Sequence, residues 1–152
     1  MELASRLLEC SASDPESTAS EAHRLLADTY SRLTKFRGFG YKVKNGPKIR
    51  SLSESAIRLD GSNSKAYLTL ALYYLHAPGA AGGSAEKTIR ILREIEGKGD
   101  LPPPERYSIL LWLAIAHSEN NEPSDAEDYL QRAFQMYPKN GWVESLLRDY
   151  GL

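Results

Sequence analysis

Apolar residues recur along this chain at the three- and four-residue spacing of amphipathic helices, and no stretch alternates as a strand does. Proline, glycine or a capping residue such as asparagine or serine bounds most of the periodic stretches, as is usual at helix ends. The pattern therefore predicts an all-α chain of eight helices. Their expected ranges are about 2–10, 15–36, 47–59, 63–77, 84–97, 102–118, 123–137 and 141–150.

Two of the predicted connections differ from the others in composition. Residues 37–47 are basic and interrupted by glycine, and residues 78–83 are rich in glycine and alanine. Both are expected to be loops, because insertions in helical arrays collect between the packed helices. The second loop is not expected to bind a nucleotide, because a helix precedes it and no Gly-Lys-Ser/Thr sequence closes it.

A short order of residues recurs in the predicted helices: leucine, then alanine, then a ring three residues later. The three copies are Leu26-Ala27 with Tyr30, Leu70-Ala71 with Tyr74, and Leu113-Ala114 with His117. Small residues at such positions let neighbouring helices approach closely, and repeated helical units stack as solenoids. The pattern predicts about three helical hairpins in a single domain, 1–152. Their ranges are about 20–61, 64–100 and 107–140, with helix 2–10 as a preceding half-repeat and helix 141–150 as a C-terminal cap.

The third hairpin resembles the tetratricopeptide repeat (TPR), a helical hairpin of roughly 34 residues. The resemblance rests on Leu110, Leu113, Ala114 and His117, followed by Ala126, Leu130, Ala133 and Pro138. Residues 67–78 and 82–87 are similar to a bacterial subgroup that includes the TPR component of tripartite periplasmic (TRAP) transporters. The resemblance implies a right-handed α-solenoid and two functions: a protein-interaction or assembly module, or a small-molecule-binding accessory subunit of a periplasmic transport system.

The resemblance also implies that the first helix of each hairpin lines a concave groove, where a peptide or helix binds. The expected partner-binding residues are Arg24, Asp28, Arg32, Lys65, Leu68, Leu72, Leu111 and Ile115. A competing interpretation stays open at this point. Helices 63–77 and 102–118 are apolar all round, which is typical of a central helix that is covered on both sides.

The basic segment offers a second candidate surface. Lys35, Arg37, Lys42 and Lys44 lie among Phe36, Phe39 and Tyr41, and the segment contains no acidic residue. Lysine and arginine beside aromatic rings suit an anionic partner such as nucleic acid, a lipid headgroup or an acidic protein. The alternative is a solvated insertion whose aromatic side chains pack back on the hairpin.

Composition narrows the function classes. The 152 residues carry a formal net charge of −1, which gives no global reason to expect nucleic acid as a partner. Cys10 is the single cysteine, so a disulfide within the chain is excluded. No apolar run approaches the ~18–20 residues of a membrane span. Without a signal peptide the sequence as given is expected in the cytoplasm, or in the periplasm if a signal has been removed.

Candidate catalytic groups are few. His23, His76 and His117 are spread over three predicted helices, and no histidine or cysteine spacing is typical of a metal site. No nucleophile and base can be paired. The sequence therefore predicts a non-enzyme without a metal or cofactor, whose partner is a protein or peptide, with homo-oligomerisation left open.

Overall fold

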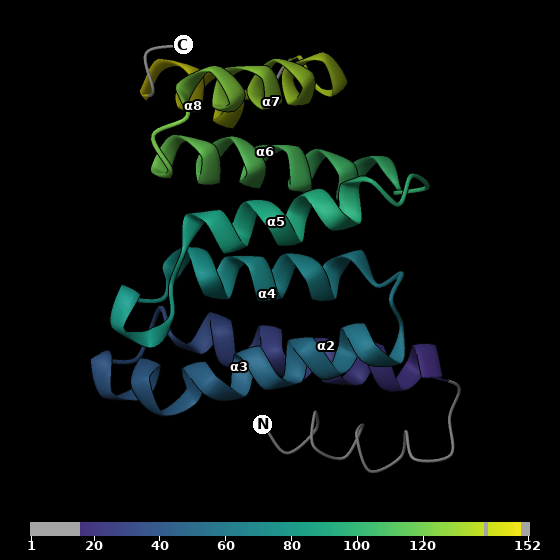
Figure 1. The fold of residues 1–152 in the computed structure, drawn as a ribbon, viewed down its shortest axis with the longest axis vertical. Helices are drawn as coiled ribbons and strands as arrows, with labels where there is room; N and C mark the ends of the chain where they lie inside the picture. Colours follow the sequence, from purple (N-terminus) through teal and green to yellow (C-terminus); the bar gives the residue numbers. More distant parts are fainter. Residues whose placement is uncertain (1–15, 139, 150–152) are drawn as a thin grey trace. The chain divides into compact units, whose positions relative to one another are not determined.

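The computed structural model describes residues 16–138 and 140–149, and every regular element within these ranges is helical. The helices are α2 (Glu16–Leu33), α3 (Phe39–Leu59), α4 (Ser64–His76), α5 (Ala85–Glu96), α6 (Pro103–Glu119), α7 (Pro123–Met136) and α8 (Gly141–Asp149), with a short 3₁₀ turn, η2 (Gly79–Ala81) (Figure 1). The predicted all-α class is confirmed. The expected helix 2–10 and Cys10 lie outside the described residues. Among the described helices, none combines the length and apolarity that crossing a bilayer requires.

The chain divides into two compact units, Met1–Gly83 (unit 1) and Ser84–Leu152 (unit 2). Unit 1 contains α2, α3 and α4, and unit 2 contains α5 to α8. The division falls between α4 and α5, inside the second predicted hairpin. Each unit buries apolar residues of its own: Leu26 and Leu70 belong to the core of unit 1, and Leu92 and Leu130 to that of unit 2.

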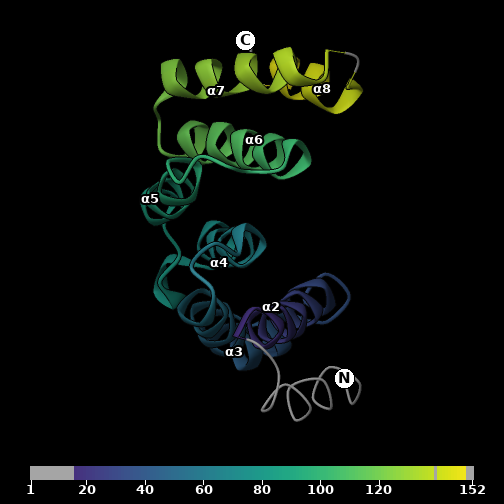
Figure 2. The same cartoon turned by 90° about the vertical axis from the view of Figure 1, so that its right-hand side faces the viewer.

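In unit 1, α2 and α3 pack side by side as an antiparallel hairpin, and α4 packs against both of them (Figure 1, Figure 2). Ala27, Ala56 and Ala71, one from each helix, are fully buried. Alanine at these positions removes side-chain bulk, so the helices can approach closely. Two of the three are the alanines that follow leucine in the recurring sequence pattern.

A buried polar link joins the three helices of unit 1. The Ser20 hydroxyl donates to the Ala56 carbonyl at 2.8 Å, and the Asn63 side-chain amide donates to Ser20 Oγ at 2.9 Å. Asn63 also caps α4, because its Oδ1 accepts a hydrogen bond from the Ala66 amide at 3.1 Å. One asparagine therefore both starts α4 and ties it to the α2–α3 hairpin.

Replacing Asn63 by alanine is expected to lower the free energy of unfolding by about 1–2 kcal/mol, because the cap and the bond to Ser20 are lost together. Equilibrium urea unfolding followed by circular dichroism measures the change. Asn63→Ser is the matched variant, since serine keeps a capping oxygen without the amide donor and adds no charge beside Glu21. It should retain part of the lost stability; a loss as large as that of Asn63→Ala would show that the cap contributes little.

The start of α3 corrects the prediction of a loop over 37–47. The helix begins at Phe39 and continues through Gly46 and Pro47. Pro47 removes one backbone hydrogen bond, which ordinarily ends or kinks a helix. Here Asn45, Ile49, Ser53 and Ala56 form a continuous buried stripe on both sides of the proline. Burial of this stripe outweighs the local cost, since most helix stability in proteins comes from packing.

In unit 2, α6 and α7 form an antiparallel hairpin, α5 packs against α6, and α8 packs against α7 (Figure 1). Most of α6 is buried, from Ile109 through His117 with the exception of Trp112. Ala114, Ala126 and Ala133 are buried where α6 and α7 meet. The apolar residues all round α6 therefore mark a central helix within this unit, as the competing interpretation of the sequence held.

Candidate functional site

The turn after α2 and the first half of α3 carry what we call the basic–aromatic surface: Lys35, Phe36, Arg37, Phe39, Lys42, Val43 and Lys44. Three of its members are the most exposed large apolar side chains in the described part of the chain. Phe36 is 84% exposed, Phe39 is 71% exposed and Val43 is 59% exposed. The interpretation of the segment as a solvated insertion whose aromatic side chains pack back on the hairpin is therefore wrong for Phe36 and Phe39.

The local helix geometry aligns two of these apolar side chains. Phe39 and Val43 are four residues apart on α3, so they lie on the same face one turn from each other. Phe36 precedes them in the turn, whose backbone is held by the bond from the Phe36 amide to the Leu33 carbonyl at 3.2 Å. Lys42 and Lys44 lie on either side of Val43, since neighbouring helix residues are rotated by about 100°.

The electrostatics of this segment are one-sided. No acidic residue occurs between Asp28 and Glu54, whereas the interval contains Arg32, Lys35, Arg37, Lys42, Lys44, Lys48 and Arg50. Arg32 pairs with Asp28 at 2.8 Å, and Arg50 pairs with Glu54 at 3.6 Å. The Lys48 ammonium lies 5.4 Å from the centre of the Tyr30 ring.

The other four cations are those that the sequence singled out. Lys35, Arg37, Lys42 and Lys44 are exposed, and none forms an ion pair with another described residue. The segment thus presents unneutralised positive charge next to exposed apolar side chains.

The charged residues predicted for the groove in unit 1 are engaged locally. Arg24 donates two hydrogen bonds to Glu21, at 2.5 and 2.7 Å, and these bonds hold the pKa of Glu21 below its ordinary value. Arg32 is paired with Asp28 within the same helix. On α4, Lys65 is exposed, whereas Leu68 and Leu72 are half-buried.

The groove residues predicted in unit 2 need a correction. Leu111 is 1% exposed and Ile115 is 8% exposed, so neither presents a surface to a partner. The physical reason is the central place of α6, which packs against both α5 and α7. The eight residues therefore do not form one exposed set. Leu111 and Ile115 are core residues. Arg24 is bonded to Glu21, and Arg32 is paired with Asp28, all within α2.

Unit 2 contains a polar pocket of about 530 Å³ between α5 and the α6–α7 turn. Its lining residues are Glu86, Ile89, Arg90, Arg93, His117, Asn120, Glu122 and Asp125. Arg93 reaches across to α7, where its Nε donates to the Tyr129 hydroxyl at 3.3 Å; this bond raises the pKa of Arg93. The Tyr129 ring in turn stacks on His117, with ring centres 5.2 Å apart.

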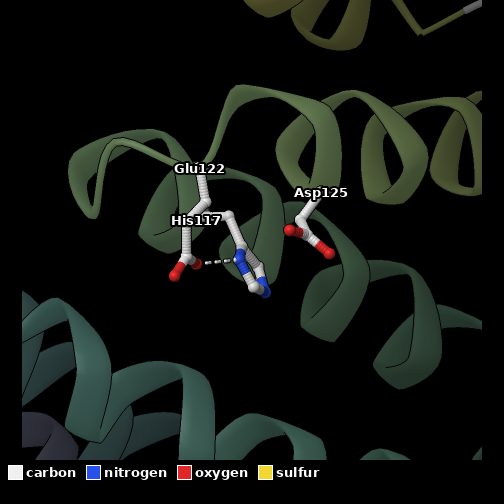
Figure 3. Close-up of side chains that lie close together, drawn as sticks. All are labelled: His117, Glu122 and Asp125. Carbon is white, nitrogen blue, oxygen red and sulfur yellow. Dashed lines mark hydrogen bonds and ion pairs between the residues drawn. The ribbon is translucent and has the colours of Figure 1, made fainter.

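Hydrogen bonds hold the α6–α7 turn, whose residues line this pocket, and Figure 3 shows the bond between His117 and Glu122. His117 Nδ1 lies 2.6 Å from Glu122 Oε2, and the Asn120 side-chain amide donates to Glu122 Oε1 at 2.9 Å. Because a carboxylate only accepts, the proton of the His117–Glu122 bond belongs to Nδ1. Between them Asn121 has φ of 60°, the left-handed conformation that asparagine tolerates better than most residues.

Three ligand-type side chains meet at this turn. His117, Glu122 and Asp125 each offer one atom, and these atoms lie within 4.8 Å of one another (Figure 3). An imidazole and two carboxylates are donors that a divalent cation accepts. However, His117 and Asn120 already occupy both Glu122 oxygens, and the Arg93 guanidinium lies 3.8 Å from Asp125 Oδ1. We therefore interpret the three side chains as structural groups whose hydrogen bonds and ion pair stabilise the α6–α7 turn, and we do not interpret them as a metal site.

The sequence analysis did not predict that these residues lie together, because His117 was interpreted only as a residue that packs between helices. The histidine is indeed buried and stacked. What was missed is its bond to Glu122, five residues further on. The available signal was a histidine at the end of a helix, two asparagines as turn residues, and then a glutamate.

Comparisons with known proteins add no family assignment: no protein-family model matches the chain, and a search of curated proteins finds no match.

Proposed function

We propose that this chain is a non-catalytic interaction module of TPR-like helical repeats, which docks on an anionic partner through the basic–aromatic surface. The repeat part of the proposal is supported by the α2–α3 and α6–α7 hairpins and by the buried alanines where their helices meet. The single observation that carries the docking function is the exposure of Phe36 and Phe39 beside lysines that form no ion pair with a described residue.

The energetics favour this surface over the other candidates. Burying a phenylalanine fully is worth about 1.5–3 kcal/mol, so two exposed rings provide a substantial driving force for association. The cations next to them lose no internal ion pair with a described residue when they bind an anion. By contrast, contact through Arg24 or Arg32 would compete with their existing pairs to Glu21 and Asp28.

The pocket of unit 2 gives less support to a small-molecule-binding function. An accessory subunit that carries a solute is expected to have a closed and partly apolar pocket. Ile89 is the one aliphatic side chain among the lining residues, and the others are charged or polar. We therefore propose no second function.

The test measures binding of the full chain to three anionic probes at low and physiological salt: polyglutamate, a single-stranded oligonucleotide, and vesicles that contain an anionic lipid. The double variant Lys42→Ala/Lys44→Ala is expected to weaken binding by roughly 10- to 30-fold at low salt, because each lysine near an anionic surface contributes about 1 kcal/mol. Binding should also fall as salt rises, through screening.

The matched control is Lys87→Ala/Lys98→Ala, which removes the same charge from exposed lysines of unit 2. It should bind like the wild type. The proposed function is refuted if no probe binds, or if both double variants weaken binding equally.

A further inference from the structure

We infer that the anionic partner is a lipid bilayer surface, on which the basic–aromatic surface lies with Phe36, Phe39 and Val43 at the boundary between headgroups and acyl chains. The inference rests on the proposed function and names its partner. It commits to an anionic membrane because the segment combines two features that such a surface requires together: a strip of exposed apolar side chains, Phe36, Phe39 and Val43, and flanking cations.

The apolar strip has the right form for the lipid boundary. Phe39 and Val43 occupy one face of α3 a turn apart, and Phe36 is exposed in the turn that precedes the helix. The backbone around the strip is open: a side-chain carbon built at Gly38 or at Gly40 would contact nothing within 4 Å. The exposure of Phe36 and Phe39 shows in addition that described parts of the chain leave most of each ring uncovered.

The charges suit the headgroup layer above the strip. Lys42 and Lys44 flank Val43 on either side, and Lys35 and Arg37 flank Phe36 in sequence. Long basic side chains keep their charge in the polar layer while the neighbouring apolar groups go deeper. The nearest acids along the chain, Asp28 and Glu54, are each paired with an arginine, so they weaken the positive field little.

Nucleic acid fits the same residues less well. Single strands are held by bases stacked on aromatic faces, and Val43 has no face to stack on. A lipid boundary rewards any apolar group, valine included. An acidic protein would use the four cations but would leave the strip without a specific counterpart.

The decisive experiment measures partitioning of the full chain onto vesicles by co-sedimentation. One set contains phosphatidylcholine alone, and the other contains phosphatidylcholine with about one third phosphatidylserine. Binding is expected to the second set only. The variant Phe36→Ser/Phe39→Ser should lower the partition coefficient by about 100-fold, roughly tenfold for each ring withdrawn from the boundary.

Two further variants test whether the effect is specific to the apolar strip and whether position 36 enters the bilayer. Leu25→Ser changes an exposed leucine on α2, away from the strip, and should bind like the wild type. In a Phe36→Trp variant, brominated lipids should quench more fluorescence than in the wild type, because position 36 lies at the boundary. Circular dichroism of each variant checks that the helices are retained.

The outcomes separate this inference from the proposed function. Binding to polyglutamate or to the oligonucleotide, with none to anionic vesicles, overturns the membrane inference and leaves the proposed function standing. Binding to anionic vesicles that ignores Phe36→Ser/Phe39→Ser also overturns it, because the strip then does not enter the boundary. Binding to none of the probes overturns both.

Discussion

Replacing Leu113 by alanine is expected to lower the free energy of unfolding of unit 2 by about 3–5 kcal/mol. Leu113 is fully buried on α6, the helix that packs against both α5 and α7. Truncation removes three buried carbon atoms, the γ methine and the two δ methyl groups, and leaves a cavity, because close-packed helices relax only in part. Few single substitutions reach this size, and those that do act on cores of this kind.

Tryptophan fluorescence during urea unfolding measures this loss selectively. The chain has two tryptophans, Trp112 and Trp142, and both fall in unit 2. The control is Glu119→Ala, at an exposed position of the same helix in unit 2, which should change stability by less than about 0.5 kcal/mol. A loss below about 1 kcal/mol for Leu113→Ala would contradict the central place of α6.

Helix ends were predictable where one residue decides them. Two helices were expected to begin at about residues 63 and 84, and there the side-chain oxygens of Asn63 and Ser84 cap α4 and α5 by accepting bonds from the Ala66 and Lys87 amides. Pro103 and Pro123 stand at helix starts, where a missing amide hydrogen costs nothing. Capping residues and prolines act on the backbone next to them, so these helix starts can be predicted from the local sequence alone.

The start of α3 was not predictable by the same reasoning. Gly46 and Pro47 are strong local signals for a loop, but the stripe that includes Asn45 and Ile49 is buried against the rest of unit 1. The stabilisation from burying this stripe depends on which helices pack together, and a short window of sequence does not contain that information. Local propensity is a weak prior that tertiary packing overrides.

In the candidate site, too, some features were predictable from the residues themselves and others depended on the fold. The four cations, Lys35, Arg37, Lys42 and Lys44, could be named from sequence because charge is a property of the residue. The exposure of Phe36 and Phe39 could not be predicted from sequence, because it depends on the turn that places Phe36 and on the register of α3. Likewise, Leu111 was assigned to a groove because nothing in the residue itself tells a lining leucine from a buried one.

Replacing Gly83 by alanine is expected to lower the free energy of unfolding of unit 1 by about 2–4 kcal/mol. The chain after α4 folds back so closely that a β-carbon at Gly83 would lie 1.8 Å from the Ala77 carbonyl oxygen. The nearest atoms to this β-carbon are backbone atoms of Ala77 and Pro78, so the contact cannot be relieved by moving a side chain. The turn would have to open, which breaks the bond from the Gly83 amide to the Pro78 carbonyl, 3.1 Å long.

Hydrogen exchange of the α4 amides reports this change directly, because the turn holds the end of α4: the Tyr73 hydroxyl donates to the Ala81 carbonyl at 3.1 Å. Protection of the last turn of α4 should fall in Gly83→Ala. The matched control is Gly79→Ala in the same connection, where an added β-carbon meets nothing within 4 Å. If the two variants exchange alike, the close return of the chain onto Ala77 is wrong, and the glycines of this loop serve flexibility alone.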